Sequence, residues 1–110
     1  MRTLEPYKNH FWDFYQSQSP SVQEKIDYVL EIVISMERIP KHFFKHLEDG
    51  IYEIRVKAGS DIYRIFCFFD EGKLVILLHG FQKKSQKTPR KEIAKAKQLR
   101  TAYYEDKDHQ

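Results

Sequence analysis

The chain has 110 residues, a hydrophobic content of 41% and a formal net charge of +3. This length fits one domain, residues 1–110, and the composition excludes a disordered chain. The one cysteine, Cys67, excludes an intrachain disulfide, and no run of hydrophobic residues is long enough to span a bilayer, so we expect a cytoplasmic protein with no membrane association.

The first half of the chain carries the pattern of helices. Residues 2–7 predict a short edge strand, and the spacing of aromatic residues predicts a helix over residues 9–18. Ser19 followed by Pro20 is a typical helix start, with serine as the cap and proline in the first turn. The second helix is expected to run to about Glu37 and to form an antiparallel hairpin with the first.

The second half changes to the two-residue period of strands. Residues 41–47 are interpreted as a helical turn or loop, and strands are expected over residues 51–57, 62–69 and 74–78. A third helix is expected to begin at Thr88-Pro89. The expected fold is therefore α+β: an N-terminal helical hairpin packed on a small three- to four-stranded antiparallel sheet, with a C-terminal helix.

Two turns predict which side chains share a face of the sheet. A two-residue turn at Gly59-Ser60 places Arg55 opposite Arg64. A two-residue turn at Glu71-Gly72 places Arg64 opposite His79. We therefore expect a row of basic side chains, Arg55, Arg64 and His79, across three neighbouring strands. If the last strand continues through Phe81, Lys83 falls on the same side as this row.

The facing arginines of this row repel each other unless an anion lies between them. One interpretation is an external phosphate, because Lys83, Lys84 and Lys87 arrive at the same end of the sheet. The alternative is that Glu53, diagonal to Arg64, bridges the arginines, so that the row only stabilises the sheet. The anion site is the favoured interpretation.

The charge distribution also indicates a phosphate-rich partner. Residues 51–110 contain thirteen Lys/Arg and eight Asp/Glu, whereas residues 1–50 contain six and eight. No Cys/His cluster has the spacing of a zinc site, and there is no phosphate-binding glycine loop, so we expect neither a metal nor a cofactor. His10, His42 and His46 are expected at the surface or at the edge of a helix, and Trp12 is expected in the core.

Three segments carry a family resemblance: Leu47-Glu-Asp-Gly-Ile-Tyr-Glu-Ile-Arg-Val-Lys-Ala-Gly, then Tyr63-Arg64-Ile65-Phe66, then Leu78-His-Gly-Phe-Gln-Lys-Lys-Ser-Gln-Lys-Thr-Pro. They resemble the HigB-like branch of the RelE/ParE superfamily, which contains toxins of type II toxin–antitoxin modules and is common in phage. The resemblance is specific over residues 47–104. It implies helices packed on a small antiparallel sheet.

The resemblance also implies an activity. RNase members of this superfamily cut mRNA in the ribosome, by attack of a ribose 2′-hydroxyl on the adjacent phosphate without a metal. By motif, Arg64 would stabilise the transition-state phosphate, and Lys83 and Lys84 match the family's basic pair. These three are the expected catalytic residues of an endoribonuclease, or mRNA interferase.

The remaining implied site residues would bind RNA: Arg55, His79, Phe81, Lys87 and Arg90. The expected partners are the ribosome, mRNA and a cognate antitoxin of the helix-turn-helix, DNA-binding HigA type, in a toxin–antitoxin hetero-oligomer. An alternative of another class is a toxin or binding module without nuclease activity, either a ParE-like inhibitor of DNA gyrase or a basic RNA-binding protein.

One departure from the family pattern concerns the general acid. RelE carries a tyrosine after its basic residues, and no tyrosine lies between Lys83 and Glu92 here. Three side chains remain as candidate acids with no preference among them: His79, Tyr104 and His109.

Overall fold

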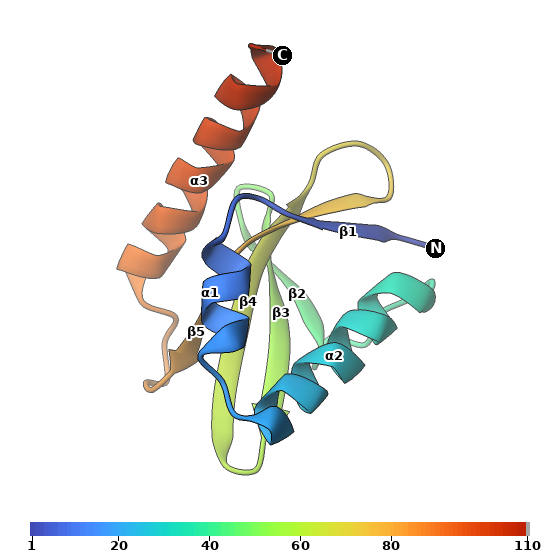
Figure 1. Cartoon of the computed structure of the whole chain (residues 1–110), viewed down its shortest axis with the longest axis vertical. Coiled ribbons are helices and arrows are strands. Elements are labelled where there is room, and N and C mark those ends of the chain that lie inside the picture. The colour runs from blue at the N-terminus through green and yellow to red at the C-terminus, as the bar shows by residue number, and fades with distance from the viewer. Residues whose placement is uncertain (110) are drawn as a thin grey trace.

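A five-stranded mixed sheet forms the centre of the fold (Figure 1). The structure is a computed structural model, and it describes residues 1–109. The strand order is β1-β5-β4-β3-β2. The elements in chain order are β1 (Thr3–Pro6), α1 (His10–Gln16), α2 (Pro20–Ser35), β2 (Phe44–Glu48), β3 (Ile51–Ala58), β4 (Asp61–Phe69), β5 (Leu74–Lys83) and α3 (Arg90–Asp108). The α+β class predicted from the sequence is confirmed.

The two edge strands correct the predicted sheet. The strand expected near the N-terminus is present as β1, but it pairs in parallel with β5, so the sheet is not purely antiparallel. Residues 41–47 were expected to be a helical turn or loop, and most of this segment is instead the strand β2, paired antiparallel with β3. The sheet therefore has five strands, one more than the largest number predicted.

The predicted N-terminal helical hairpin is also wrong. The helix α1 packs on β5, whereas α2 packs on β3, so each covers a separate part of the same sheet face. The cap of α2 is as predicted, because the Ser19 hydroxyl accepts a hydrogen bond from the Val22 amide at 3.4 Å. Helix α1 is only seven residues long, and its buried side chains Phe11 and Phe14 join the core that α1 and α2 both cover on the sheet.

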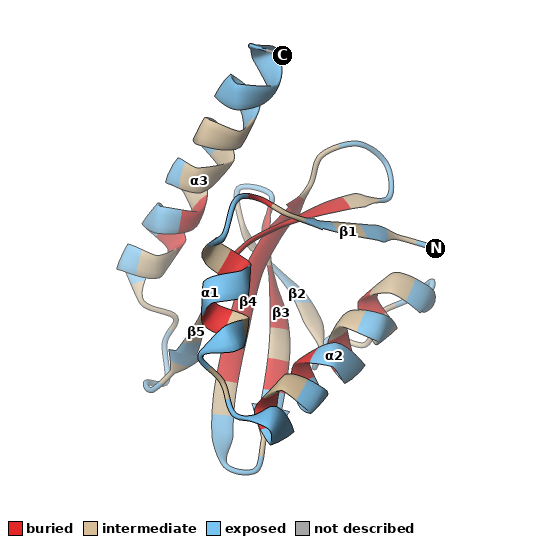
Figure 2. Cartoon of the chain, viewed as in Figure 1, coloured by how far each residue is buried: buried red, intermediate tan, exposed pale blue. Residues whose placement is uncertain are grey.

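Two hydrophobic cores lie on opposite faces of the sheet (Figure 2). One core lies beneath α1 and α2, and we name that side of the sheet the α1/α2 face. The other lies beneath α3, on the α3 face, and includes Phe66, Phe68, Ile76, Leu78 and Ile93. Because β3, β4 and β5 carry buried side chains on both faces, they form the rigid centre of the molecule.

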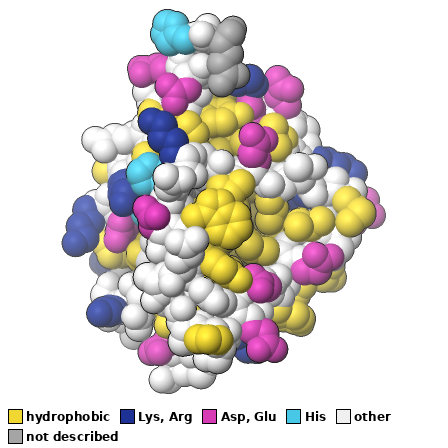
Figure 3. All heavy atoms as spheres, viewed as in Figure 1, with side chains coloured by type: hydrophobic (Ala, Val, Ile, Leu, Met, Phe, Trp, Pro, Cys, Tyr) yellow, Lys and Arg dark blue, Asp and Glu magenta, His cyan; other side chains and the backbone are white. Residues whose placement is uncertain are grey.

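Cys67 is fully buried in the first core. Trp12 was expected in the core, but its side chain is 46% exposed on α1. Figures 1 and 3 share one viewpoint, with α1 and α2 in front of the sheet. In Figure 3, hydrophobic side chains gather at the surface in the middle of this view. Over residues 1–109, no helix combines the length and apolar character needed to cross a membrane.

The register of the hairpins decides which side chains reach the α3 face. The turn at Gly59-Ser60 is as predicted, with Ala58 paired with Asp61 and therefore Arg55 opposite Arg64. Gly59 has φ of +63°, which glycine adopts readily.

The β4–β5 register differs from the prediction in two places. The turn holds three residues instead of two, because the Asp70 amide donates to the Leu74 carbonyl at 2.9 Å. A bulge follows: Phe66 alone faces Leu78 and His79, which lie between the paired residues of β5. Arg64 is consequently opposite Phe81 rather than His79. The two shifts are one residue each, so together they return the residues after the bulge, including Lys83, to the face predicted for them.

Candidate functional site

Four basic side chains gather on the α3 face near the β3–β4 turn, beyond the part of the sheet that α3 covers. Arg55 and Arg64 are cross-strand partners, Lys45 is paired with Glu53 across β2 and β3, and Lys83 is the last residue of β5. We name Lys45, Arg55, Arg64 and Lys83 the cationic cluster. Its members come from four neighbouring strands, so the rigid sheet fixes their spacing.

Glu53 lies in the middle of the cationic cluster, with a side chain that is 3% exposed. Its Oε1 is 3.1 Å from Arg55 Nε, and its Oε2 is 3.5 Å from Arg64 Nε. The bridging carboxylate considered in the sequence is therefore present. However, among the described residues Glu53 Oε2 and both Nε atoms lack a hydrogen-bond partner. One carboxylate facing four cations leaves the cluster positive and incompletely satisfied, which suits a further anion.

Burial also affects the titration of the cluster. Burial lowers the pKa of the Arg64 guanidinium, which still remains charged near neutral pH. Burial, followed by the positive charge of Arg64, lowers the pKa of the Lys83 ammonium group. Lys83 therefore gives up its proton more readily than an ordinary lysine.

Phe81 supports the floor of the site. It lies opposite Arg64 on β5, and its ring packs edge-on against Phe66 with centroids 5.2 Å apart. Lys84 follows β5 and lines, together with Lys83 and Ile62, an open pocket of about 650 Å³ beside the cluster. Lys87 lies farther along the same loop and is exposed. The sequence therefore predicted correctly that Lys83 shares the face of Arg64.

His79 lies on the predicted face but is covered. The side chain is 3% exposed, and its Nε2 lies 3.3 Å from Glu92 Oε1 on α3. Its Nδ1 has no hydrogen-bond partner in the described part of the chain. Burial, and then the charge of Lys95, lowers the pKa of His79. In this position the imidazole supports α3 and does not reach the open surface where RNA was expected to bind.

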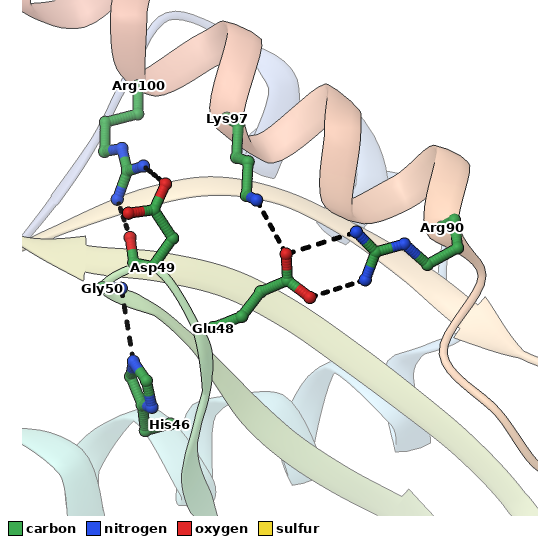
Figure 4. Close-up of polar contacts among 7 residues, drawn as sticks. All are labelled: His46, Glu48, Asp49, Gly50, Arg90, Lys97 and Arg100. Atoms are coloured by element: carbon green, nitrogen blue, oxygen red, sulfur yellow. Dashed lines mark hydrogen bonds and ion pairs between the residues drawn. The ribbon is translucent and has the colours of Figure 1, made fainter.

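Arg90 is also separated from the cluster. Figure 4 shows that Arg90 and Lys97 of α3 both contact Glu48 at the end of β2, with Arg90 Nη1 at 2.5 Å and Lys97 Nζ at 2.7 Å from its carboxylate oxygens. One turn farther along α3, Arg100 contacts Asp49 at 2.9 Å. These ion pairs connect α3 to the β2–β3 turn. Arg90, which was predicted to bind RNA, is therefore already paired with Glu48.

The other predicted acids lie toward the opposite end of α3. Tyr104 packs against Phe68, four residues beyond Arg64 on β4, which corresponds to about 13 Å along a strand. His109 follows the end of α3. Neither side chain is brought to the cationic cluster.

Two residues beside the site were not recognised from the sequence: Lys45 of the cationic cluster, and His42, which lines a pocket with Arg55 and Arg64. Both lie in the segment that was interpreted as a turn or loop, so no face could be assigned to them. The alternation of Phe44, which packs in the core, and Lys45, which is exposed, was the available signal for a strand. Within residues 1–109, no group of three or more His, Cys, Asp or Glu side chains could hold a metal ion.

Comparison with protein families gives a match over most of the chain. The family model described as "Phage derived protein Gp49-like (DUF891)" matches residues 13–101, a segment that contains the whole cationic cluster. No curated protein matches the chain.

Proposed function

The chain belongs to the phage-derived Gp49-like family, which is associated with toxin–antitoxin modules, and from this premise we propose that it is the toxin of a type II toxin–antitoxin module. In more detail, we propose a HigB-like, ribosome-dependent endoribonuclease that cleaves mRNA. The observation that carries the proposal is the cationic cluster with its single, incompletely bonded counter-ion.

The proposed reaction is attack of a ribose 2′-hydroxyl on the neighbouring phosphorus, which gives a 2′,3′-cyclic phosphate and a 5′-hydroxyl. Negative charge increases on the phosphate oxygens in the transition state. Fixed cations stabilise that charge best when they need no rearrangement. Arg64 is suited to this role because burial and the Glu53 carboxylate hold its guanidinium in place.

Lys83 is assigned to proton transfer. Its lowered pKa increases the fraction of free amine, which can accept the proton of the attacking 2′-hydroxyl. Arg55 positions the phosphate beside Arg64. Lys84 and Lys87 bind the RNA backbone on the loop side, and Phe81 supports Arg64 from the neighbouring strand.

The partners follow from the same proposal. A member of a toxin–antitoxin family is expected to have a cognate antitoxin, which we propose to be a helix-turn-helix protein of the HigA type. An acidic segment of the antitoxin would neutralise the cationic cluster most directly. The ribosome and mRNA are the proposed targets of the free toxin.

The test is induction of the wild type, Arg64→Ala and Arg38→Ala, followed by primer extension on cellular mRNA. Arg38 is an exposed arginine after α2, outside the cluster, and serves as the matched control. We expect cuts within translated codons for the wild type and Arg38→Ala and none for Arg64→Ala, with thermal melting used to check that the variant is folded. Growth arrest without cuts would contradict the nuclease proposal and favour gyrase inhibition or RNA binding alone.

A further inference from the structure

The proposed reaction needs a proton donor for the 5′-oxygen that leaves, and the members of the cationic cluster do not supply one. The guanidinium groups stay charged at neutral pH, and Lys83 is assigned to accept a proton. The donor must reach the same phosphate from another direction. A small open pocket of about 230 Å³ beside the cluster is lined by His42, Arg55, Val56, Lys57, Ile62 and Arg64.

His42 is held at this pocket by the backbone of its own segment. The Arg55 amide donates to the Phe43 carbonyl at 2.7 Å, and Arg55 Nη1 donates to the Lys41 carbonyl at 3.5 Å. Phe43 packs into the core on the α1/α2 face, with its ring 6.1 Å from that of Tyr28 on α2. The preceding residue, His42, lines the pocket on the side of the arginines.

The imidazole of His42 is also restrained. Its ring centroid lies 4.0 Å from that of Phe43, with the two planes tilted by 44°. The residue as a whole remains exposed, so RNA can reach the ring. Charged groups from two strands line the pocket beside His42: Arg55 and Lys57 from β3, and Arg64 from β4.

We propose that His42 is the catalytic residue that protonates the leaving 5′-oxygen, an inference that rests on the proposed endoribonuclease function. The 2′-oxygen forms a bond to phosphorus and gives its proton to the Lys83 amine. The bond between phosphorus and the 5′-oxygen breaks, and the electron pair of that bond takes a proton from the His42 imidazolium. The products are the 2′,3′-cyclic phosphate, the 5′-hydroxyl, neutral His42 and protonated Lys83, and solvent restores both groups.

Histidine suits this step better than the other ionisable side chains at the pocket. Imidazole exchanges a proton near neutral pH, whereas arginine and an ordinary lysine hold theirs. The arginines in the same pocket bind the phosphate whose ester oxygen receives the proton, so donor and substrate meet in one place.

The test measures single-turnover cleavage of ribosome-bound mRNA by the wild type, His42→Gln, His46→Gln and Arg64→Ala. His46 is the matched control, because it is an exposed histidine on β2 whose Nε2 accepts a hydrogen bond from the Gly50 amide (Figure 4). We expect His42→Gln to reduce the single-turnover rate constant by about 10²- to 10⁴-fold with little change in the concentration that gives half the maximal rate, and to lose the decline of rate at high pH that a proton donor causes. His46→Gln should retain the wild-type rate.

A second substrate separates proton donation from positioning. In an RNA whose scissile 5′-oxygen is replaced by sulfur, the leaving thiolate needs no proton. We expect His42→Gln to cleave this RNA nearly as fast as the wild type, whereas Arg64→Ala stays slow. Two results would overturn the role of His42 and leave the nuclease proposal standing. In the first, His42→Gln is equally slow on both substrates. In the second, His42→Gln is fully active on ordinary RNA while Arg64→Ala is inactive. If the wild type cleaves neither RNA, both proposals fall.

Discussion

Arg55 on β3 and Arg64 on β4 are direct cross-strand partners, and the carboxylate of Glu53 contacts both guanidinium groups. Two arginines in this arrangement repel each other, and one carboxylate offsets only part of that repulsion. The sheet fixes the arginines while Glu53 orients them. A phosphate that entered the cluster would therefore meet cations that are already in place.

Replacement of Glu53 by glutamine tests how this arrangement is stabilised. Glu53→Gln leaves the nearly buried guanidinium of Arg64 and the partly exposed one of Arg55 without their counter-ion, so the free energy of unfolding should fall by about 3–5 kcal/mol in urea denaturation. Added sulfate should raise the melting temperature of this variant more than that of the wild type. Glu71→Gln is the control, because the Glu71 side chain is 79% exposed and its loss should change the free energy of unfolding by no more than about 0.5 kcal/mol. An unchanged unfolding midpoint for Glu53→Gln would show that the ion pairs do not stabilise the fold.

Lys83 and Lys84 are neighbours in sequence with different expected roles. Lys83→Ala should lower the cleavage rate at saturating substrate by about 10²- to 10⁴-fold, because the proton acceptor is lost. Lys84→Ala should instead weaken RNA binding and reduce the dependence of log affinity on log salt concentration by about one. Single-turnover kinetics and binding titrations at several salt concentrations measure both effects. Equal losses of rate in the two variants would contradict the assignment of Lys83.

His79 should make the protein less stable in mild acid. Its pKa in the folded protein is lowered from the ordinary value of 6.5, mainly by burial. Below pH 6.5, the unfolded chain therefore binds a proton at this position that the folded protein binds less readily. The free energy of unfolding consequently decreases as the pH falls through this range. Chemical denaturation at a series of pH values should show a smaller decrease for His79→Gln than for the wild type, and His109→Gln should behave like the wild type. If the free energy of unfolding decreased equally in all three proteins, its dependence on pH would come from groups other than His79.

The tether between α3 and β2 should depend on salt. Arg90 and Lys97 lower the pKa of Glu48 to about 2, so the ion pairs persist at neutral pH and are lost only in strong acid. Glu48→Gln removes both pairs, and we expect a fall in melting temperature that is smaller than the fall for Glu53→Gln. Because exposed ion pairs are screened, the difference from the wild type should shrink in 1 M salt, where the Debye length is about 3 Å. A difference that is independent of salt would indicate that Glu48 contributes through packing.

The sequence predicted the position of Arg55 opposite Arg64 because the information was local. Gly59-Ser60 is a short turn with a glycine at positive φ, and the register of a hairpin follows from its turn. The capped start of α2 was predictable for the same reason. The face of Lys83 was also correct, although its register was not, because the bulge at Leu78 and His79 depends on how β5 packs beneath α3.

The strand β2 and the packing of the two N-terminal helices could not be predicted from such local signals. β2 is five residues long with a bulge after His46, so it shows too few alternations to be distinguished from a loop. Whether α1 packs on α2 or on β5 is decided by tertiary contacts, since either partner could cover Phe11 and Phe14. Lys45 and His42 were missed because they depend on the position of β2.

The bulge and the three-residue turn of the β4–β5 hairpin have a consequence for changes in chain length. Lys83 lies on the α3 face because the two irregularities occur together, whereas either one alone would shift the register by one residue. Deleting one residue from either place alone would turn Lys83 toward the α1/α2 face and bring Lys84 into its position. Insertions and deletions in this hairpin should therefore preserve function only in even numbers, which makes its length, as much as its composition, a determinant of the site.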